Sequence, residues 1–272
     1  MDAPSSVVGR AAAVLRALSQ SDPGGATTAS LGRRAGLPRP TTHRLLSALQ
    51  GEGFIDRTAD GRWVLGPELF LLGAAASSRY DMTEQARPVL RRLAQATGES
   101  AFFSVRRGDE TVCLMREDGS FPIRSFVLYE GLRLPLGVAS AGLAILAFLP
   151  DPWVAAYLET SELVSAWGES HAPEPLLRRL QATRKEGYST NPGLLVEGSW
   201  GMGAAVFDAQ GRPTGALSLT GIEQRFSAGR RPQLGRLLLD EAHRLTGLLA
   251  RGGSQPRPPT AVEQCRGSDT KN

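Results

Sequence analysis

Apolar residues recur at helical spacing three times near the start of the chain. This periodicity predicts helices over Val7–Leu18, Thr28–Ala35 and Pro40–Leu49. Residues 21–25 (Ser-Asp-Pro-Gly-Gly) separate the first two helices, and residues 36–38 (Gly-Leu-Pro) separate the second from the third. Because glycine and proline interrupt helices, we expect three short helices joined by turns.

Two segments of alternating apolar and polar residues follow the third helix. Phe54–Arg57 and Arg62–Leu65 are predicted to be short strands, and residues 58–61 (Thr-Ala-Asp-Gly) are typical of a hairpin turn. Three helices followed by a hairpin are the elements of a winged helix-turn-helix. The sequence therefore predicts a DNA-binding domain of this kind over residues 1–66.

The rest of the chain has a different pattern. An apolar helix is predicted over Pro67–Tyr80, within a connecting segment at residues 67–81. Further helices are predicted over Thr83–Ala96, Ala139–Phe148, Pro152–Leu158, Pro175–Glu186 and Pro232–Leu249, and strands over Ala101–Val105, Thr111–Arg116, Ile123–Leu128, Trp200–Phe207 and Thr214–Leu219. This order favours an α+β domain with an antiparallel sheet over residues 82–250. Residues 251–272 are rich in proline, glycine and polar residues, so we expect a disordered tail.

Composition supports two ordinary soluble domains. Of 272 residues, 41% are hydrophobic and 21% are charged. No apolar run approaches the roughly 20 residues that span a bilayer, and the N-terminus lacks the pattern of an export signal. The two cysteines, Cys113 and Cys265, are far apart in the sequence. We therefore expect a cytoplasmic protein with no membrane contact, disulfide, metal or cofactor.

The positions of the basic residues are more informative than the formal net charge of +4. A recognition helix presents polar groups at its N-terminal end to the major groove of DNA. The candidates for groove contacts are Arg39, Thr41, Thr42, His43 and Arg44, with Arg33 and Arg34 as phosphate contacts and Arg57 and Arg62 in the wing. Two alternatives stay open: a three-helix bundle with solvated arginines, and a packed rather than DNA-contacting His43.

One run of residues carries a specific resemblance. It contains Gly36-Leu37-Pro38, the Thr-Thr-His-Arg-Leu-Leu segment at 41–46, Asp-Gly-Arg before an aromatic residue at 60–63, and Leu65-Gly66. This run, Ala29–Gly73, resembles the N-terminal domain of the IclR family of bacterial regulators, and the similarity continues to about Phe226. The resemblance implies an N-terminal winged helix-turn-helix plus a GAF-like α/β effector-binding domain with an antiparallel sheet. It also implies a linker helix, a small-molecule effector, and homodimers or homotetramers on double-stranded operator DNA.

The resemblance further implies where the effector binds. The family usually builds its pocket from three stretches, which in this chain contain Ser140 and Ala141, then Asn191 and Gly201, and finally Ser218 and Thr220. Backbone N–H groups at the helix start near Ser140 suit a carboxylate. The alternative is structural: Ser218 and Thr220 end a strand, and the small residues at 140–142 only allow close packing.

Several positions depart from the family's usual pocket. Gly137, Leu143, Leu194 and Gly201 stand where polar or charged residues are common in the family. These departures predict a less polar pocket, and they favour a larger or aromatic organic acid as effector.

Enzyme functions find little support. The sequence has no GxSxG elbow, HExxH pair or phosphate loop, and Gly201-Met202-Gly203 lacks the third glycine of a dinucleotide motif. We therefore expect no catalytic residues. The rival hypotheses are an enzyme with an accessory winged helix and a DNA-binding protein that needs no ligand.

Overall fold

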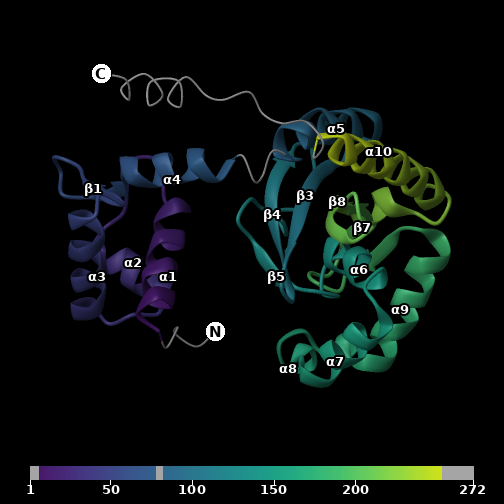
Figure 1. Cartoon of the computed structure of the whole chain (residues 1–272), viewed down its shortest axis with the longest axis horizontal. Helices are drawn as coiled ribbons and strands as arrows, with labels where there is room; N and C mark the ends of the chain where they lie inside the picture. The colour runs from purple at the N-terminus through teal and green to yellow at the C-terminus, as the bar shows by residue number, and fades with distance from the viewer. Residues whose placement is uncertain (1–5, 78–81, 253–272) are drawn as a thin grey trace, which may run out of the picture. The chain divides into compact units, whose positions relative to one another are not determined.

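The computed structural model describes residues 6–77 and 82–252 (Figure 1). The chain folds into two compact units, Met1–Asp81 and Met82–Asn272. The C-terminal helix continues to Gly252, so it includes the first two residues of the segment predicted to be disordered. The rest of that segment, residues 253–272, lies outside the described residues, as do the last four residues of the predicted linker, 78–81.

The N-terminal unit has the predicted order of three helices and a hairpin. Its elements are α1 Val7–Ser19, α2 Thr28–Ala35, α3 Arg39–Gly51, β1 Ile55–Arg57, β2 Trp63–Leu65 and α4 Pro67–Ser77. One buried residue or more from each of the first five elements meets in a single core, which includes Val14, Leu31, Leu46, Ile55 and Trp63. Trp63 also fixes the wing to the helices, because its Nε1 donates to Thr28 Oγ1 at 2.9 Å.

The turn between α2 and α3 depends on two glycines. Gly36 ends α2 in the left-handed conformation, with φ of 64°, and Leu37 N donates to Gly32 O at 2.9 Å. A Cβ at Gly32 would lie 3.0 Å from Thr42 Oγ1 and 3.1 Å from Leu37 O. The absence of a side chain at Gly32 therefore allows the start of α3 to pack directly on α2.

The C-terminal unit is built on a six-stranded antiparallel sheet with the order β5-β4-β3-β8-β7-β6. Its strands are β3 Ser100–Arg107, β4 Glu110–Glu117, β5 Arg133–Pro135, β6 Ser189–Pro192, β7 Ser199–Phe207 and β8 Pro213–Ile222. Its helices are α5 Met82–Thr97, α6 Ser140–Ala147, α7 Asp151–Thr160, α8 Leu163–Trp167, α9 Pro173–Glu186 and α10 Arg231–Gly252, with short 3₁₀ turns η2 Glu169–His171 and η3 Glu223–Phe226. The predicted α+β class is confirmed.

Two apolar cores lie on the two faces of this sheet. One contains buried residues of α5 and α10, and the other contains α6 together with parts of α7 and α9 (Figure 1). All eight residues of α6 are buried. Glycines in β7 let α6 approach the sheet, because a Cβ at Gly203 would lie 2.8 Å from Ser140 O. The first residue of α6 is thereby pressed against the middle of β7.

A buried carboxylate ties the start of the sheet to the C-terminal helix region. Glu99 is 2% exposed and pairs at 2.7 Å with both Arg225 and Arg230. Arg230 Nη2 also donates to Thr97 O, so the Thr97-Gly98-Glu99 motif joins the end of α5 to η3 and the start of α10. Pairing with two guanidinium groups offsets the cost of burying the charge.

One predicted strand is wrong, and the sequence did not predict β5 or β6. The predicted strand at Ile123–Leu128 is wrong: it belongs to a loop in which Ile123 and Phe126 are exposed and Leu128 is buried. The chain pairs with β4 only later, at β5. Conversely, β6 has the sequence Ser-Thr-Asn-Pro, which lacks the apolar alternation that would have predicted a strand.

Candidate DNA interface and effector cavity

The first half of α3 presents basic side chains to solvent. Arg39, His43 and Arg44 are exposed and Thr41 is half-buried. The helix begins with Pro40 in its first turn and has no acidic residue there. Together with Arg33 on α2, Arg39 lines a groove of about 500 Å³ between the two helices. This surface offers cations and hydrogen-bond donors without a nearby acidic side chain from α2 or α3.

Thr42 does not belong to this surface. It is fully buried, and its Oγ1 donates to Pro38 O at 3.0 Å. The prediction that Thr42 faces the DNA groove is therefore wrong in this structure. Its place in the helix turns it towards Gly32 of α2, so it packs the turn instead of reading bases.

The two arginines of α2 have different surroundings. Arg34 Nη1 donates to Ala17 O at 3.4 Å, Gln20 O at 3.3 Å and Ser21 Oγ at 3.1 Å. It thus satisfies carbonyls at the end of α1, where a cation is also favoured by the helix dipole. Arg33 is exposed beside the groove. Of the two, Arg33 is the better placed to contact a phosphate.

Both wing arginines fold back onto the hairpin. Arg57 Nε donates to Gly61 O at 3.1 Å, and its guanidinium lies 5.2 Å from the Trp63 ring centre. Arg62 Nη1 donates to Gly25 O at 3.2 Å, and its Nε lies 3.3 Å from Asp60 Oδ2. In this structure they stabilise the wing, and Asp60 places a negative charge at its tip.

Four of the six predicted effector residues surround one small cavity. Ser140, Asn191, Gly201 and Thr220 line it, together with Val127, Leu128, Ala139, Leu195, Ser199 and Trp200. Its volume is about 10 Å³, roughly the space of one water molecule. Ala141 and Ser218 are buried but do not line it. The cavity is closed to a ligand of several carbon atoms in this conformation.

Three buried hydroxyl groups near the cavity lack a partner within residues 6–77 and 82–252. They are Ser100 Oγ, Ser218 Oγ and Thr220 Oγ1. Ser100 is paired across the sheet with Thr220, and Ser218 lies two residues before Thr220 on the same face. An unsatisfied buried hydroxyl costs about 1–3 kcal/mol. A ligand or water that bonds to these groups would remove that cost.

Asn191 is already engaged by the protein. Its Nδ2 donates to Val138 O at 2.7 Å, and its Oδ1 accepts from Leu194 N at 3.0 Å. It therefore holds the backbone just before α6. Helix α6 begins at Ser140 with no side-chain cap. No capping side chain therefore accepts a hydrogen bond from the first N–H groups of the helix. Gly201 gives room for Ser140, since a Cβ there would lie 3.0 Å from Ser140 Oγ.

A loop closes the cavity from the side of β7. Ser125 Oγ and Ser199 Oγ lie 2.6 Å apart and share a hydrogen bond. This bond holds the loop that carries Val127 and Leu128. Sequence reasoning missed these four residues and Ser100. The register of Ser100 with Thr220 would have identified Ser100, but register depends on strand pairing, which one sequence does not reveal.

The Cys113 thiol and potential metal ligands are further chemical groups of the described chain. Burial raises the pKa of the Cys113 thiol to about 12, so this cysteine is protonated and a poor nucleophile at neutral pH. Within the described ranges, no three His, Cys, Asp or Glu residues are grouped to hold a metal. None of the described helices is long and apolar enough to cross a bilayer.

Both units match known sequence families. Residues 7–59 match the IclR helix-turn-helix domain, and residues 74–246 match the bacterial transcriptional regulator IclR C-terminal domain. The chain belongs to the IclR family. Members combine a helix-turn-helix DNA-binding domain with a C-terminal effector-binding domain, and this chain has both.

Named relatives of this IclR-family chain are regulators. It is 30% identical to the HTH-type transcriptional regulator KipR of Bacillus subtilis over 79% of this chain and 86% of KipR. It is 29% identical to the transcriptional repressor IclR of Escherichia coli, over 85% of this chain and 84% of that protein. An IclR homologue from Microbacterium hydrocarbonoxydans, solved in complex with 4-hydroxybenzoate, is 25% identical with a TM-score of 0.72, covering 91% of this chain and all of that one.

Proposed function

We propose that this IclR-family regulator binds operator DNA through α3, and that an organic acid in the cavity beside α6 controls its affinity for the operator. The observation that carries the first part is the exposed basic start of α3 on a winged helix. Arg39, His43 and Arg44 supply the side chains for the major groove, with Thr41 beside them and Arg33 on a phosphate. Arg34, Arg57 and Arg62 mainly support the domain.

The second part is supported by the unpaired polar groups around the cavity. The acid's carboxylate would accept hydrogen bonds from the N–H groups of Ser140 and Ala141 at the start of α6. The hydroxyls of Thr220, Ser218 and Ser100 are available to further polar atoms of the ligand. The apolar part would lie against Val127, Leu195 and Trp200. Asn191 and Gly201 would shape the cavity, not bind the acid.

We infer an aromatic acid and not a very small one from four positions where the family often has polar or charged residues, of which Gly201 lines the cavity. Leucine or glycine occupies the positions at 137, 143, 194 and 201, and a similar family member from Microbacterium was solved with 4-hydroxybenzoate. A benzene ring is far larger than a cavity of about 10 Å³. Binding therefore requires the cavity to open, and we propose that the loop with Val127 and Leu128 moves outwards as the first event in signalling.

We further propose that the regulator acts as a homodimer or homotetramer in the cytoplasm. A helix-turn-helix dimer binds two half-sites about 34 Å, or one helical turn, apart. In α4, Phe70 is 76% exposed, Leu71 58% and Leu72 50%, and a second copy would cover such apolar side chains. Residues 67–81 would link the DNA-binding domain to the effector-binding and oligomerisation domain at 82–250.

Fluorescence anisotropy tests the DNA-binding part. The purified protein is titrated onto its own upstream intergenic DNA and onto a scrambled duplex of equal length at near-physiological salt. We expect a preference of about 10³-fold or more. Equal binding to both duplexes, and to every duplex of a wider selection, would contradict the proposal and favour a ligand-independent DNA-binding protein or an enzyme.

A second titration tests the cavity. 4-Hydroxybenzoate is added to the operator complex of the wild type and of the double variant Ser218→Val and Thr220→Val. Coupling free energies of about 1–3 kcal/mol are usual, so we expect the acid to change operator affinity by about 5–150-fold in the wild type and by less than twofold in the variant. An identical response of the two proteins would refute the assignment of these hydroxyls.

A further inference from the structure

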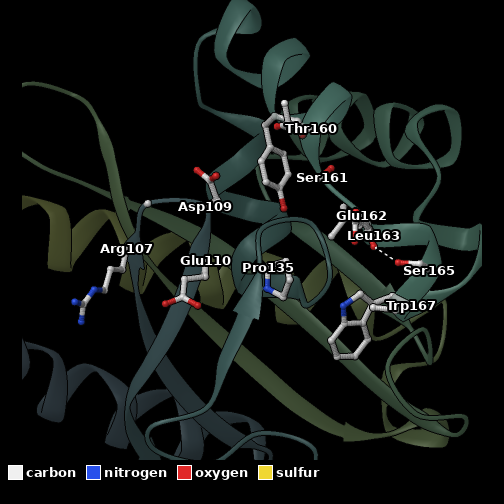
Figure 2. Close-up of a pocket in the computed structure, with 13 residues that line it drawn as sticks. Arg107, Asp109, Glu110, Pro135, Thr160, Ser161, Glu162, Leu163, Ser165 and Trp167 are labelled. Carbon is white, nitrogen blue, oxygen red and sulfur yellow. Dashed lines mark hydrogen bonds between the residues drawn. The ribbon is translucent and has the colours of Figure 1, made fainter. Parts of the chain in front are cut away.

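The effector-binding domain contains another cavity that the proposed function does not use. It has a volume of about 680 Å³ and opens between the β3–β4 turn and the segment from α7 to α8 (Figure 2). Pockets for small organic ligands have about 300–1,000 Å³. None of its lining residues lines the cavity beside α6. We call it the hairpin cleft.

The inner wall of the hairpin cleft is apolar and held in place. Tyr157 and Leu163 are buried, and Pro135 and Trp167 are half-buried. Tyr157 stacks on Trp153 with ring centres 5.3 Å apart and planes 12° apart. The Tyr157 hydroxyl donates to Leu136 O at 2.8 Å. A flat or apolar ligand would therefore meet a preformed surface.

The rim of the hairpin cleft is negative although the whole chain has a net charge of +4. Asp109 on the β3–β4 turn and Glu162 before α8 are exposed, and within the described residues neither forms a salt bridge. Figure 2 shows them on different sides of the cleft. Burial, and after it the charge of Asp109, raises the pKa of Tyr157. The negative charge of Asp109 therefore acts on Tyr157 in the cleft wall.

Nearby cations form no salt bridge with Asp109 or Glu162 within the described residues, although Arg107 also lines the cleft and the charge of Asp109 acts on Arg106. Arg133 pairs with Glu110, the third carboxylate of the cleft. Arg106 donates to Gly108 O at 2.9 Å and lies over the Trp153 ring, 4.4 Å from its centre. The Arg107 guanidinium points away from the cleft interior in Figure 2. Two carboxylates thus remain available to a ligand.

We propose that the hairpin cleft binds an organic cation with an apolar or aromatic body, such as an arylalkylamine. Its ammonium group would lie between Asp109 and Glu162, and its apolar part would pack on Trp167, Leu163 and Pro135. Attraction to both carboxylates and to the face of Trp167 favours a cation over a neutral molecule of the same shape.

The hairpin cleft is joined to the start of α6 by a short backbone segment. Leu136 N donates to Asp109 O at 2.9 Å, while Leu136 O accepts from Tyr157. Two residues later, Val138 O accepts from Asn191 beside the effector cavity. A cation that restrains Asp109 and Tyr157 would therefore reduce the mobility of the backbone that leads into α6. The role of this link in regulation rests on the proposed function, but binding of the cation does not.

Isothermal titration calorimetry of the full-length protein with 2-phenylethylammonium at pH 7 tests this site. The neutral isostere 2-phenylethanol has the same body without the charge, and we expect it to bind at least about tenfold more weakly. The double variant D109N and E162Q should lose at least about tenfold in affinity for the ammonium. The control E159Q removes one acidic charge of the same region outside the cleft lining, and should stay within twofold of the wild type.

Other outcomes separate this proposal from the proposed function. Unchanged affinity for the cation in the Ser218→Val and Thr220→Val variant, combined with slower hydrogen exchange at the Leu136 and Val138 amides on binding, would support a separate but linked site. The proposal would be overturned by equal binding of the alcohol and the ammonium, by undiminished binding to D109N and E162Q, or by no binding at all. None of these failures affects operator binding through α3.

Discussion

Around the start of α3, some side chains face solvent and others pack inwards and hold the helix in place. Arg44 is exposed, and an arginine that reads a guanine contributes about 1–3 kcal/mol of discrimination. We predict that Arg44→Ala weakens operator binding by about this amount and flattens the preference over scrambled DNA. Anisotropy on both duplexes measures it.

The control for Arg44 is Arg16→Ala. Arg16 is exposed near the end of α1, so this variant loses the same charge without touching α3. The Arg16 variant should keep its preference for the operator. If both variants lose affinity equally on both duplexes, Arg44 supplies only charge and the assignment is wrong.

His171 makes stability depend on pH at the level of one residue. It is 1% exposed, and burial lowers its pKa, with a smaller contribution from the charge of Arg179. In the unfolded chain its pKa is about 6.5. As the pH falls below about 6.5, the unfolded chain gains a proton that the folded protein resists, so folding stability falls.

We therefore predict that His171→Gln reduces this loss of stability. Denaturant unfolding of the C-terminal unit at several pH values from 8 to 5, followed for both proteins, measures the difference in slope. His43 and His243 remain in both proteins and cancel. Parallel pH profiles for the wild type and the variant would show that His171 does not contribute.

At the scale of elements, the contact between α6 and β7 decides the form of the effector cavity. Gly203 faces Ser140 O, and an added Cβ would lie 2.8 Å from that backbone oxygen. Since backbone cannot rotate away as a side chain can, we predict that Gly203→Ala destabilises the C-terminal unit by about 1–3 kcal/mol and raises its susceptibility to denaturant.

The matched control is Gly229→Ala. No atom lies within 4 Å of a Cβ built at Gly229, and its φ is not positive, so stability should change by less than about 0.5 kcal/mol. Chemical denaturation of the two variants gives the comparison. Equal stability of the two variants would mean that α6 can move away from β7 at little cost in free energy. The shape of the small cavity would then not be fixed.

The same elements show what the sequence could predict. Helices with a regular apolar stripe, such as α1 and α3, were located within a few residues because one buried face imposes a period of 3.6. The β1–β2 hairpin was predicted from its turn at residues 58–61. β6 and the loop at 118–132 were not, because their positions depend on pairing with β7 and on closing over α6, which are contacts between distant segments.

For the candidate sites, the sequence indicated which residues lie near the cavity better than it indicated where side chains point. Ser140, Asn191, Gly201 and Thr220 were predicted, and they surround one cavity. The directions of side chains were harder to predict: Thr42 faces inwards, and Asn191 bonds to Val138 O. The hairpin cleft has no sequence motif, because Asp109 and Glu162 come together only through the fold.

At the scale of the whole molecule, the proposed homodimer would place two recognition helices on one face of the operator DNA. Inserting five base pairs between the half-sites rotates them by about half a turn, while inserting ten restores their alignment. We predict that the five-pair insertion abolishes most of the specific affinity and that the ten-pair insertion recovers part of it. Gel-shift titrations on the three duplexes test this, and equal binding to all would exclude a symmetric dimer.

The hydrogen bond between Ser125 and Ser199 has a kinetic consequence. If a ligand enters only when this bond is broken, the observed association rate will stop rising at high ligand concentration and will equal the rate of opening. Apparent affinity will then be lower than intrinsic affinity by the fraction of open molecules. The fraction of open molecules would then set the effector concentration at which the regulator responds. In that case a single pair of hydroxyl groups at the edge of the cavity would help to set this concentration.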